Sequence, residues 1–170
     1  MKGMLRGFAA LALATVFATS TANAQGMQVG IGGTALFNLD SDNSGTDFGV
    51  MAKIGSNQAA GIGFRFDLSA IFSSGTTGII LGVGPTYAFA TSETSMFKPY
   101  LLAELNVFTN TDNLTDNLGD KLGASAGAGF TYRMSSVDLF AEAIFTYMFE
   151  DVFGKPFRVN AGVAFPLGGN

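Results

Sequence analysis

Residues 62–72 read IGFRFDLSAIF, and this stretch decides the fold. Apolar side chains occupy every second position from Ile62 to Phe72, whereas Arg65 and Asp67 occupy alternate positions at the centre. A period of two predicts a β-strand whose successive side chains point to opposite faces. This strand therefore needs an apolar environment on one face and a polar one on the other.

Seven further segments repeat this alternation. The apolar faces of the eight predicted strands run from Met27 to Leu39, Phe48 to Ile54, Ile62 to Phe72, Ile79 to Phe89, Phe97 to Val107, Ala124 to Tyr132, Val137 to Phe149 and Phe157 to Phe165. The polar loops 40–47, 109–121 and 150–155 alternate with the shorter connections 55–59, 91–96 and 134–136, and only 73–77 is short where a loop is due. Long loops at one end and tight turns at the other predict an all-β fold, an eight-stranded antiparallel transmembrane up-and-down β-barrel. Pro85 interrupts the fourth segment and predicts a β-bulge there.

The polar face of the strands carries charges in mid-strand. These residues are Lys53, Arg65, Asp67, Glu104, Arg133, Glu142 and Arg158. A soluble eight-stranded barrel fills its interior with large apolar side chains. Because the charges oppose the apolar residues here, we predict the inverse arrangement, in which a lumen charge network is surrounded by an apolar wall in lipid. A static ion-paired plug is favoured over a gate, since such a lumen is just wide enough for side chains to fill it.

Aromatic residues on the apolar face fall into two groups. Those expected near the loop end are Phe37, Phe48, Phe72, Tyr147, Phe149 and Phe157, and those expected near the turn end are Phe66, Tyr87, Phe89, Phe97, Tyr132 and Phe165. Aromatic rings prefer the two interfaces of a bilayer, so two belts indicate outer-membrane lipid as the partner of the wall.

The first 24 residues have the order of a secretory signal peptide. Lys2 and Arg6 precede the apolar run 8–17, and the segment ends in Ala-Asn-Ala at 22–24. This order of regions is typical of a cleaved signal, and the run is too short for a membrane-spanning helix. We therefore expect residues 1–24 to be removed and residues 25–170 to form a single barrel domain in the cell outer membrane.

The composition excludes several functions. Without Lys2 and Arg6 the chain has seven basic and 13 acidic residues, a net charge of −6, which gives no footprint for nucleic acid. The chain contains neither His nor Cys, so the commonest general base and the commonest ligands of transition metals are missing. Glu104 and Glu142 could form a carboxylate pair, but neighbouring arginines favour ion pairing. We expect no enzymatic activity and no cofactor.

Two loops carry weaker signals. Asp40, Asp42 and Ser44 place oxygen atoms at alternate positions, as at the start of a calcium loop, but the twelfth position of that pattern is Met51 rather than Glu. A solvated turn-forming loop is therefore favoured over a metal site. Segment 109–121 contains the repeated TDNL, and we expect 40–47 and 109–121 to make any external contacts, because loops carry most barrel specificity.

Several short motifs carry a family resemblance. They are GVGPTY at 82–87, Pro99-Tyr100, GASAGAGFTYR at 123–133, and Glu142 within the seventh strand. With them the chain resembles the small outer-membrane β-barrel family that includes outer membrane proteins A and X and porin-like barrel domains. The resemblance implies a lumen too blocked for bulk flow and a terminal strand whose aromatic residue, here Phe165, is read by the barrel assembly machinery.

The expected function is non-enzymatic: envelope integrity, with surface contacts through external loops. Two alternatives stay open. One is a narrow porin-like channel for ions or small solutes, and the other is a soluble periplasmic barrel that binds a lipid-like ligand with the alternation inverted.

Overall fold

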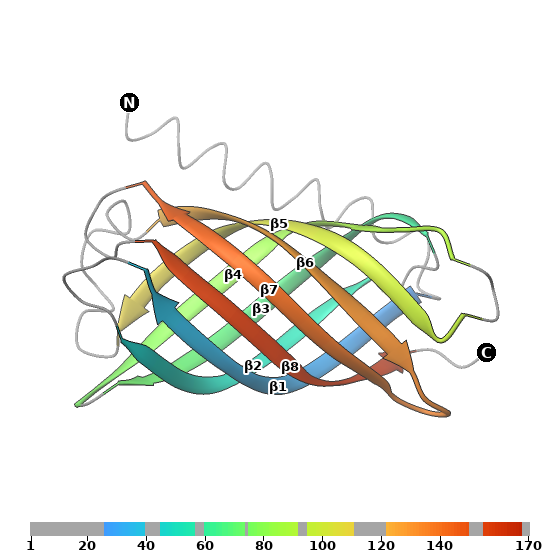
Figure 1. The fold of residues 1–170 in the computed structure, drawn as a ribbon, viewed down its shortest axis with the longest axis horizontal. Helices are drawn as coiled ribbons and strands as arrows, with labels where there is room; N and C mark the ends of the chain where they lie inside the picture. Colours follow the sequence, from blue (N-terminus) through green and yellow to red (C-terminus); the bar gives the residue numbers. More distant parts are fainter. Residues whose placement is uncertain are drawn as a thin grey trace.

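The computed structural model describes residues 26–39, 45–56, 60–73, 75–91, 95–110, 122–149 and 155–167. They form eight strands, which are β1 (Met27–Asn38), β2 (Thr46–Ser56), β3 (Gly61–Ser73), β4 (Thr76–Ala88), β5 (Phe97–Asn110), β6 (Leu122–Arg133), β7 (Asp138–Met148) and β8 (Pro156–Leu167). Each strand pairs antiparallel with the next, and β8 pairs with β1 to close the barrel (Figure 1). The predicted all-β, eight-stranded antiparallel barrel is confirmed. Within these ranges no helix is long and apolar enough to cross a membrane.

The barrel has two distinct ends. At the turn end β1 begins and β8 finishes, and there β2 connects to β3, β4 to β5, and β6 to β7 (Figure 1, right). At the loop end the β3–β4 connection is the exception: Ser73 pairs with Thr76, and Gly75 takes a φ of 92° that suits a tight hairpin. The predicted signal peptide 1–24, the metal candidates Asp40, Asp42 and Ser44, and most of the loops 40–47, 109–121 and 150–155 lie outside the described residues.

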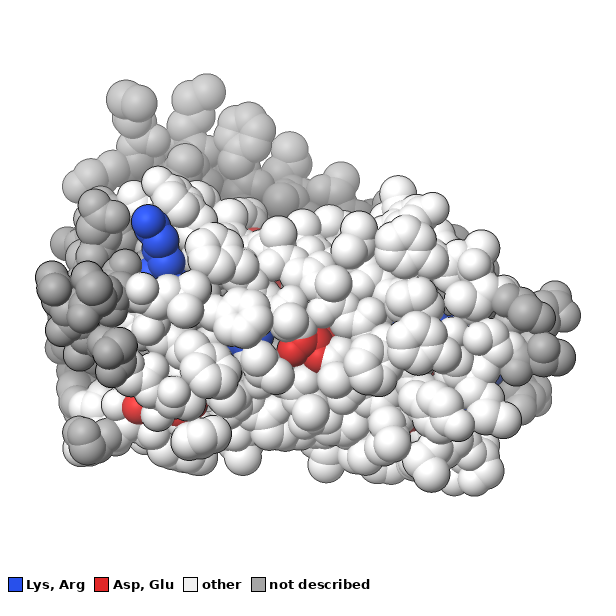
Figure 2. All heavy atoms as spheres, viewed as in Figure 1, with Lys and Arg blue, Asp and Glu red and all other residues white. Residues whose placement is uncertain are grey.

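The two faces of the strands differ as the alternation predicts. On the outer face Phe48 is 66% exposed, Phe66 43% and Leu105 53%, whereas inward-facing Asp67 and Arg158 are both 0% exposed. Figure 2 shows an outer wall that is almost free of charged residues on this side of the molecule. The barrel is therefore inverted relative to a soluble one, with its apolar side chains outside.

The seam that closes the barrel depends on two glycines. Gly32 of β1 and Gly162 of β8 lie directly opposite each other at inward positions. A Cβ atom at Gly32 would collide with the backbone of Ala161, and one at Gly162 would collide with the backbone of Ile31. Only glycine fits strands that approach so closely, and glycine kinks of this kind give a small barrel its curvature.

The β-bulge expected at Pro85 is absent. The β4–β5 ladder pairs Val83 with Leu105 and Thr86 with Leu102, so the register is the same on both sides of Gly84 and Pro85. On the other side Pro85 still pairs with Phe64 of β3. The missing N–H of proline is accommodated by a local gap in one ladder and needs no inserted residue.

Candidate functional site

Six of the seven predicted lumen charges meet in one buried cluster, which we call the charged layer. It consists of Lys53 on β2, Arg65 and Asp67 on β3, Glu104 on β5, Glu142 on β7 and Arg158 on β8. Three cations therefore face three carboxylates, and the layer is neutral when all six groups are ionised. A neutral set of this kind is the arrangement in which charges tolerate burial.

Arg65 lies at the centre of this layer and contacts all three carboxylates. Its Nη1 is 2.8 Å from Glu142 Oε1, its Nη2 is 3.1 Å from Asp67 Oδ2, and its Nε is 2.7 Å from Glu104 Oε1. The Nε contact is an ion pair without hydrogen-bond geometry. Arg158 closes the cluster, with Nη1 3.4 Å from Asp67 and Nη2 3.2 Å from Glu104.

The network spans strands that are not neighbours in the sheet. Lys53 lies directly opposite Asp67 in the β2–β3 pairing, yet its Nζ crosses the lumen to Glu142 Oε1 on β7, 2.6 Å away. Arg158 on β8 reaches β3 and β5 in the same way. These contacts brace opposite walls of the barrel, and the backbone ladders do not supply such bracing.

Glu142 accepts hydrogen bonds from residues that the sequence analysis did not assign to the lumen network. The hydroxyl of Tyr100 donates to Oε1, and Asn160 Nδ2 donates to Oε2 at 3.1 Å. Lys53 Nζ also donates to Tyr100 at 3.3 Å and lies 3.5 Å from the centroid of the Phe140 ring. Tyr100, Asn160 and Phe140 all occupy inward positions, so the period of two was the signal that could have found them.

Arg133 does not join the charged layer. It is the last residue of β6, its side chain is 48% exposed, and its Nε is 3.6 Å from Asp138 Oδ1 at the start of β7. Its inward position coincides with the mouth of the barrel, where a long side chain can reach water. The expected place of Arg133 in the lumen network is therefore corrected to the rim of the turn end.

The lumen is apolar toward the loop end. Ile71, Ile80, Phe108 and Met148 are buried against one another, and Leu36 packs on them; we call this cluster the apolar layer. Between the two layers Asn106 Nδ2 donates to Ser125 Oγ at 2.5 Å, and Ser125 Oγ lies 2.7 Å from Thr146 Oγ1. The predicted charge network is thus only part of the filling. The apolar residues were not predicted, because single apolar residues on a polar face carry little periodic signal.

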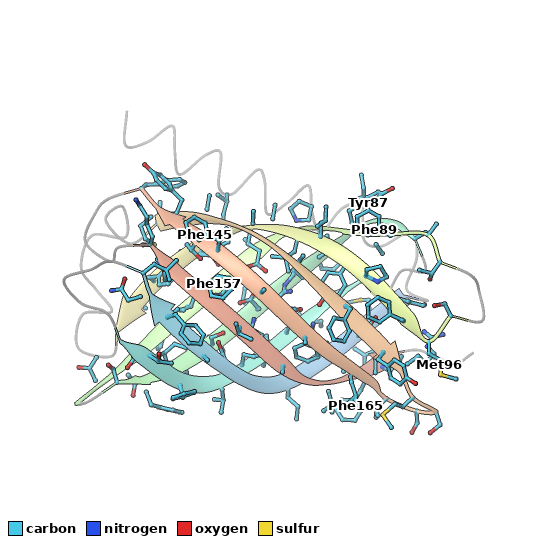
Figure 3. All side chains as sticks on the ribbon, in the orientation of Figure 1. Tyr87, Phe89, Met96, Phe145, Phe157 and Phe165 are labelled. Atoms are coloured by element: carbon cyan, nitrogen blue, oxygen red, sulfur yellow. The ribbon has the colours of Figure 1, made fainter. Side chains whose placement is uncertain are left out.

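The aromatic residues predicted for the interfaces lie on the outer face, most of them toward one end or the other. Figure 3 shows Phe145 and Phe157 toward the loop end, and Tyr87, Phe89 and Phe165 toward the turn end. Phe37 and Phe157 lie 6.1 Å apart between ring centroids, and Tyr87 and Phe89 form an edge-to-face pair at 5.4 Å. Phe66 departs from the predicted belt, because it pairs with Ile54 and Val83 in the middle of β3.

The geometry of the charged layer fits a role in bracing the barrel walls better than it fits a catalytic role. Glu104 and Glu142, the only carboxylate pair considered for catalysis, are each held by Arg65 and have fully buried side chains. Both carboxylates are engaged in ion pairs inside the lumen, which suits bracing rather than contact with a substrate. Within the described part of the chain, no group of three or more acidic side chains is placed so that it could hold a metal ion.

Comparison with known proteins identifies the fold alone. The sequence matches no family model and no curated protein. Among solved structures, Neisserial surface protein A is 18% identical with a TM-score of 0.64, over 83% of this chain and 97% of that one. The N-terminal barrel domain of OprF from Pseudomonas aeruginosa is 18% identical, with a TM-score of 0.56 over 81% and 96%. The outer membrane protein OprG of the same organism is 11% identical, with a TM-score of 0.59 over 85% and 97%. The chain thus has the fold of the small eight-stranded outer-membrane β-barrels.

Proposed function

We propose that this chain is a non-enzymatic integral protein of the outer membrane in a Gram-negative-type envelope, exported by a cleaved signal peptide at 1–24. It supports the envelope and makes surface contacts through loops 40–47 and 109–121. The observation that carries the proposal is the inverted distribution of side chains. A wall of exposed Phe, Leu and Ile around a buried charged layer matches lipid outside and would be an aggregation hazard in water.

The apolar layer supports a structural role over a conducting one. Ile71, Ile80, Phe108 and Met148 fill the lumen at the loop end, and an apolar constriction excludes ions by dewetting. A narrow channel remains the second candidate because polar side chains, those of the charged layer and of the Asn106–Ser125–Thr146 chain, occupy part of the lumen. The soluble lipid binder requires the large apolar residues inside, and the observed alternation runs against it.

Substitution on the outer wall tests the membrane location. Leu81 faces outward in β4, 36% exposed, directly opposite Leu68 of β3. An arginine at the bilayer midplane costs ~2–4 kcal/mol, so Leu81→Arg should fail to reach the membrane fraction as a species with heat-modifiable gel mobility. Leu81→Phe is the matched control and should assemble. Normal assembly of Leu81→Arg, or a native chain recovered folded in the soluble periplasmic fraction, would refute the proposal.

Single-channel recording separates the two candidates. Residues 25–170, refolded in detergent and inserted into a planar bilayer, should show no steady openings if the lumen is a plug. Insertion is checked by heat-modifiable mobility of the same preparation. Steady openings whose conductance changes in Arg65→Ala would make the charged layer a pathway and establish the channel instead.

A further inference from the structure

A small cavity opens at the turn end of the lumen, beside the charged layer. Its volume is about 40 Å³, room for roughly three waters or one tetrahedral oxyanion. The polar residues that line it are Gln28, Lys53, Ser56, Arg65, Thr86, Lys98, Tyr100 and Thr131. Three of these residues are cations and none is a carboxylate, so the cavity has the character of an anion site.

The three cations are not equally available. Lys53 and Arg65 are both ion-paired within the charged layer, Lys53 with Glu142 and Arg65 with Asp67, Glu104 and Glu142. Lys98 is half-buried, faces inward on β5 opposite Thr131 of β6, and forms no ion pair among the described residues. The charged groups near it, Arg133 and Asp138, pair with each other at the rim. Among the described residues, therefore, no carboxylate forms an ion pair with Lys98, and its ammonium group can meet an anion in the cavity.

Neutral donors surround the same space. Ser56 Oγ accepts a hydrogen bond from the Phe64 amide at 3.1 Å, which leaves its own hydroxyl proton able to point elsewhere. Thr131 is buried, 7% exposed, and Thr86 also lines the cavity. Gln28 Oε1 is buried without a hydrogen-bond partner in the described part of the chain, and the amide turned over would present its NH2 group there.

From this geometry we propose that the cavity binds a small oxyanion, such as a phosphate, sulfate or carboxylate group, with Lys98 as the principal cation. Hydroxyl groups of Ser56, Thr86 and Thr131 complete the set of donors. Hydrogen bonds to a charged acceptor are stronger than those between neutral groups, and partial burial strengthens them further. The same lining rejects cations, because every charged side chain on it is positive.

Thermal unfolding in the presence of phosphate tests the site. The refolded chain is heated in an uncharged, phosphate-free detergent with increasing inorganic phosphate, and the midpoint of the gel-mobility change is recorded. A ligand that binds only the folded state raises this midpoint. Sodium chloride at equal ionic strength controls for screening.

Two matched variants locate the effect. Lys98→Met removes the ammonium group, while Lys155→Met removes an exposed lysine just before β8 at the other end of the barrel. In Lys98→Met, at least about tenfold more phosphate should be needed to raise the midpoint by the same amount, which is the loss of affinity expected for one charge-assisted hydrogen bond. In Lys155→Met the phosphate dependence of the midpoint should be unchanged. If Lys98→Met fails to fold, Thr131→Val provides the test and should weaken binding several-fold.

The outcomes also distinguish the source of the oxyanion. A Lys98-dependent shift with inorganic phosphate identifies a free anion, whereas a Lys98-dependent shift only with a short-chain phosphatidic acid in the micelle identifies a lipid headgroup. No shift with either compound, or an equal shift in the native chain, Lys98→Met and Lys155→Met, would overturn the proposal.

Discussion

The charged layer and the apolar layer fill the lumen in different ways, although the same strands contribute to both. On β3, Arg65 and Asp67 belong to the charged layer and Ile71 belongs to the apolar layer; on β5, Glu104 and Phe108 divide in the same way. The inward face of a single strand thus changes from charged to apolar within four residues. A lumen this narrow leaves side chains little choice but to fill it, and either chemistry can do so.

Side chains of the charged layer and of the apolar layer differ in what they require of their neighbours. An apolar side chain needs only close packing, and any apolar neighbour of suitable size will serve. A buried charge needs a specific opposite charge within reach, because desolvation costs several kcal/mol per ion. The charged layer therefore adds specificity, since Lys53 and Glu142 meet only when β2 and β7 face each other in one arrangement. The apolar layer adds closure of the lumen.

Removal of Glu142 should lower the free energy of unfolding by the largest amount. Glu142→Ala leaves Lys53 and Arg65 without their shared acceptor, and it also leaves the hydroxyl of Tyr100 without the acceptor of its hydrogen bond. Breaking one side of a buried ion pair costs about 3–5 kcal/mol of unfolding free energy. This loss is measured by urea unfolding in lipid vesicles. Circular dichroism is used to monitor the unfolding, because the chain contains no Trp.

The double variant Lys53→Ala/Glu142→Ala provides the control for this prediction. Its loss should be smaller than the sum of the two single losses, since the second substitution removes a charge that the first left unpaired. A loss in Glu142→Ala below about 1 kcal/mol would mean that water, rather than Glu142, satisfies the cations.

Truncation in the apolar layer should cost somewhat less and for a different reason. Ile80 is 2% exposed among Ile71, Phe108 and Met148. Ile80→Ala should lower the free energy of unfolding by about 2–4 kcal/mol through lost burial and a cavity, with no dependence on ionic strength. The adjacent Ile79 points to the outer face and is the matched control, for which Ile79→Ala should cost about 1 kcal/mol or less. Equal losses at both positions would mean that Ile80 is not packed in a lumen core.

Sequence periodicity predicted the walls of this barrel better than its filling. The strands, their antiparallel order and the inward position of Arg65, Asp67 and Glu142 follow from a period of two, since alternation fixes the face of each side chain. The partners of these residues do not follow from it. Lys53 bonds across the lumen rather than to the adjacent Asp67, and that choice depends on the tilt and stagger of the strands, which no single strand encodes. Ile71, Ile80 and Phe108 were overlooked because they sit on the face that the charges marked as polar.

The smallest effect is expected at Arg133, whose inward position alone suggested a place in the network. Its side chain is 48% exposed and its contact with Asp138 is long, at 3.6 Å, so Arg133→Ala should cost less than about 1 kcal/mol, and less still in high salt. Arg158, fully buried between Asp67 and Glu104, is the matched arginine, and Arg158→Ala should cost about 3–5 kcal/mol at any ionic strength. Both are measured by the same urea unfolding. A comparable, salt-independent loss at Arg133 would mean that the charged layer extends to the rim, and the turn end would then have no free mouth through which an anion could reach Lys98.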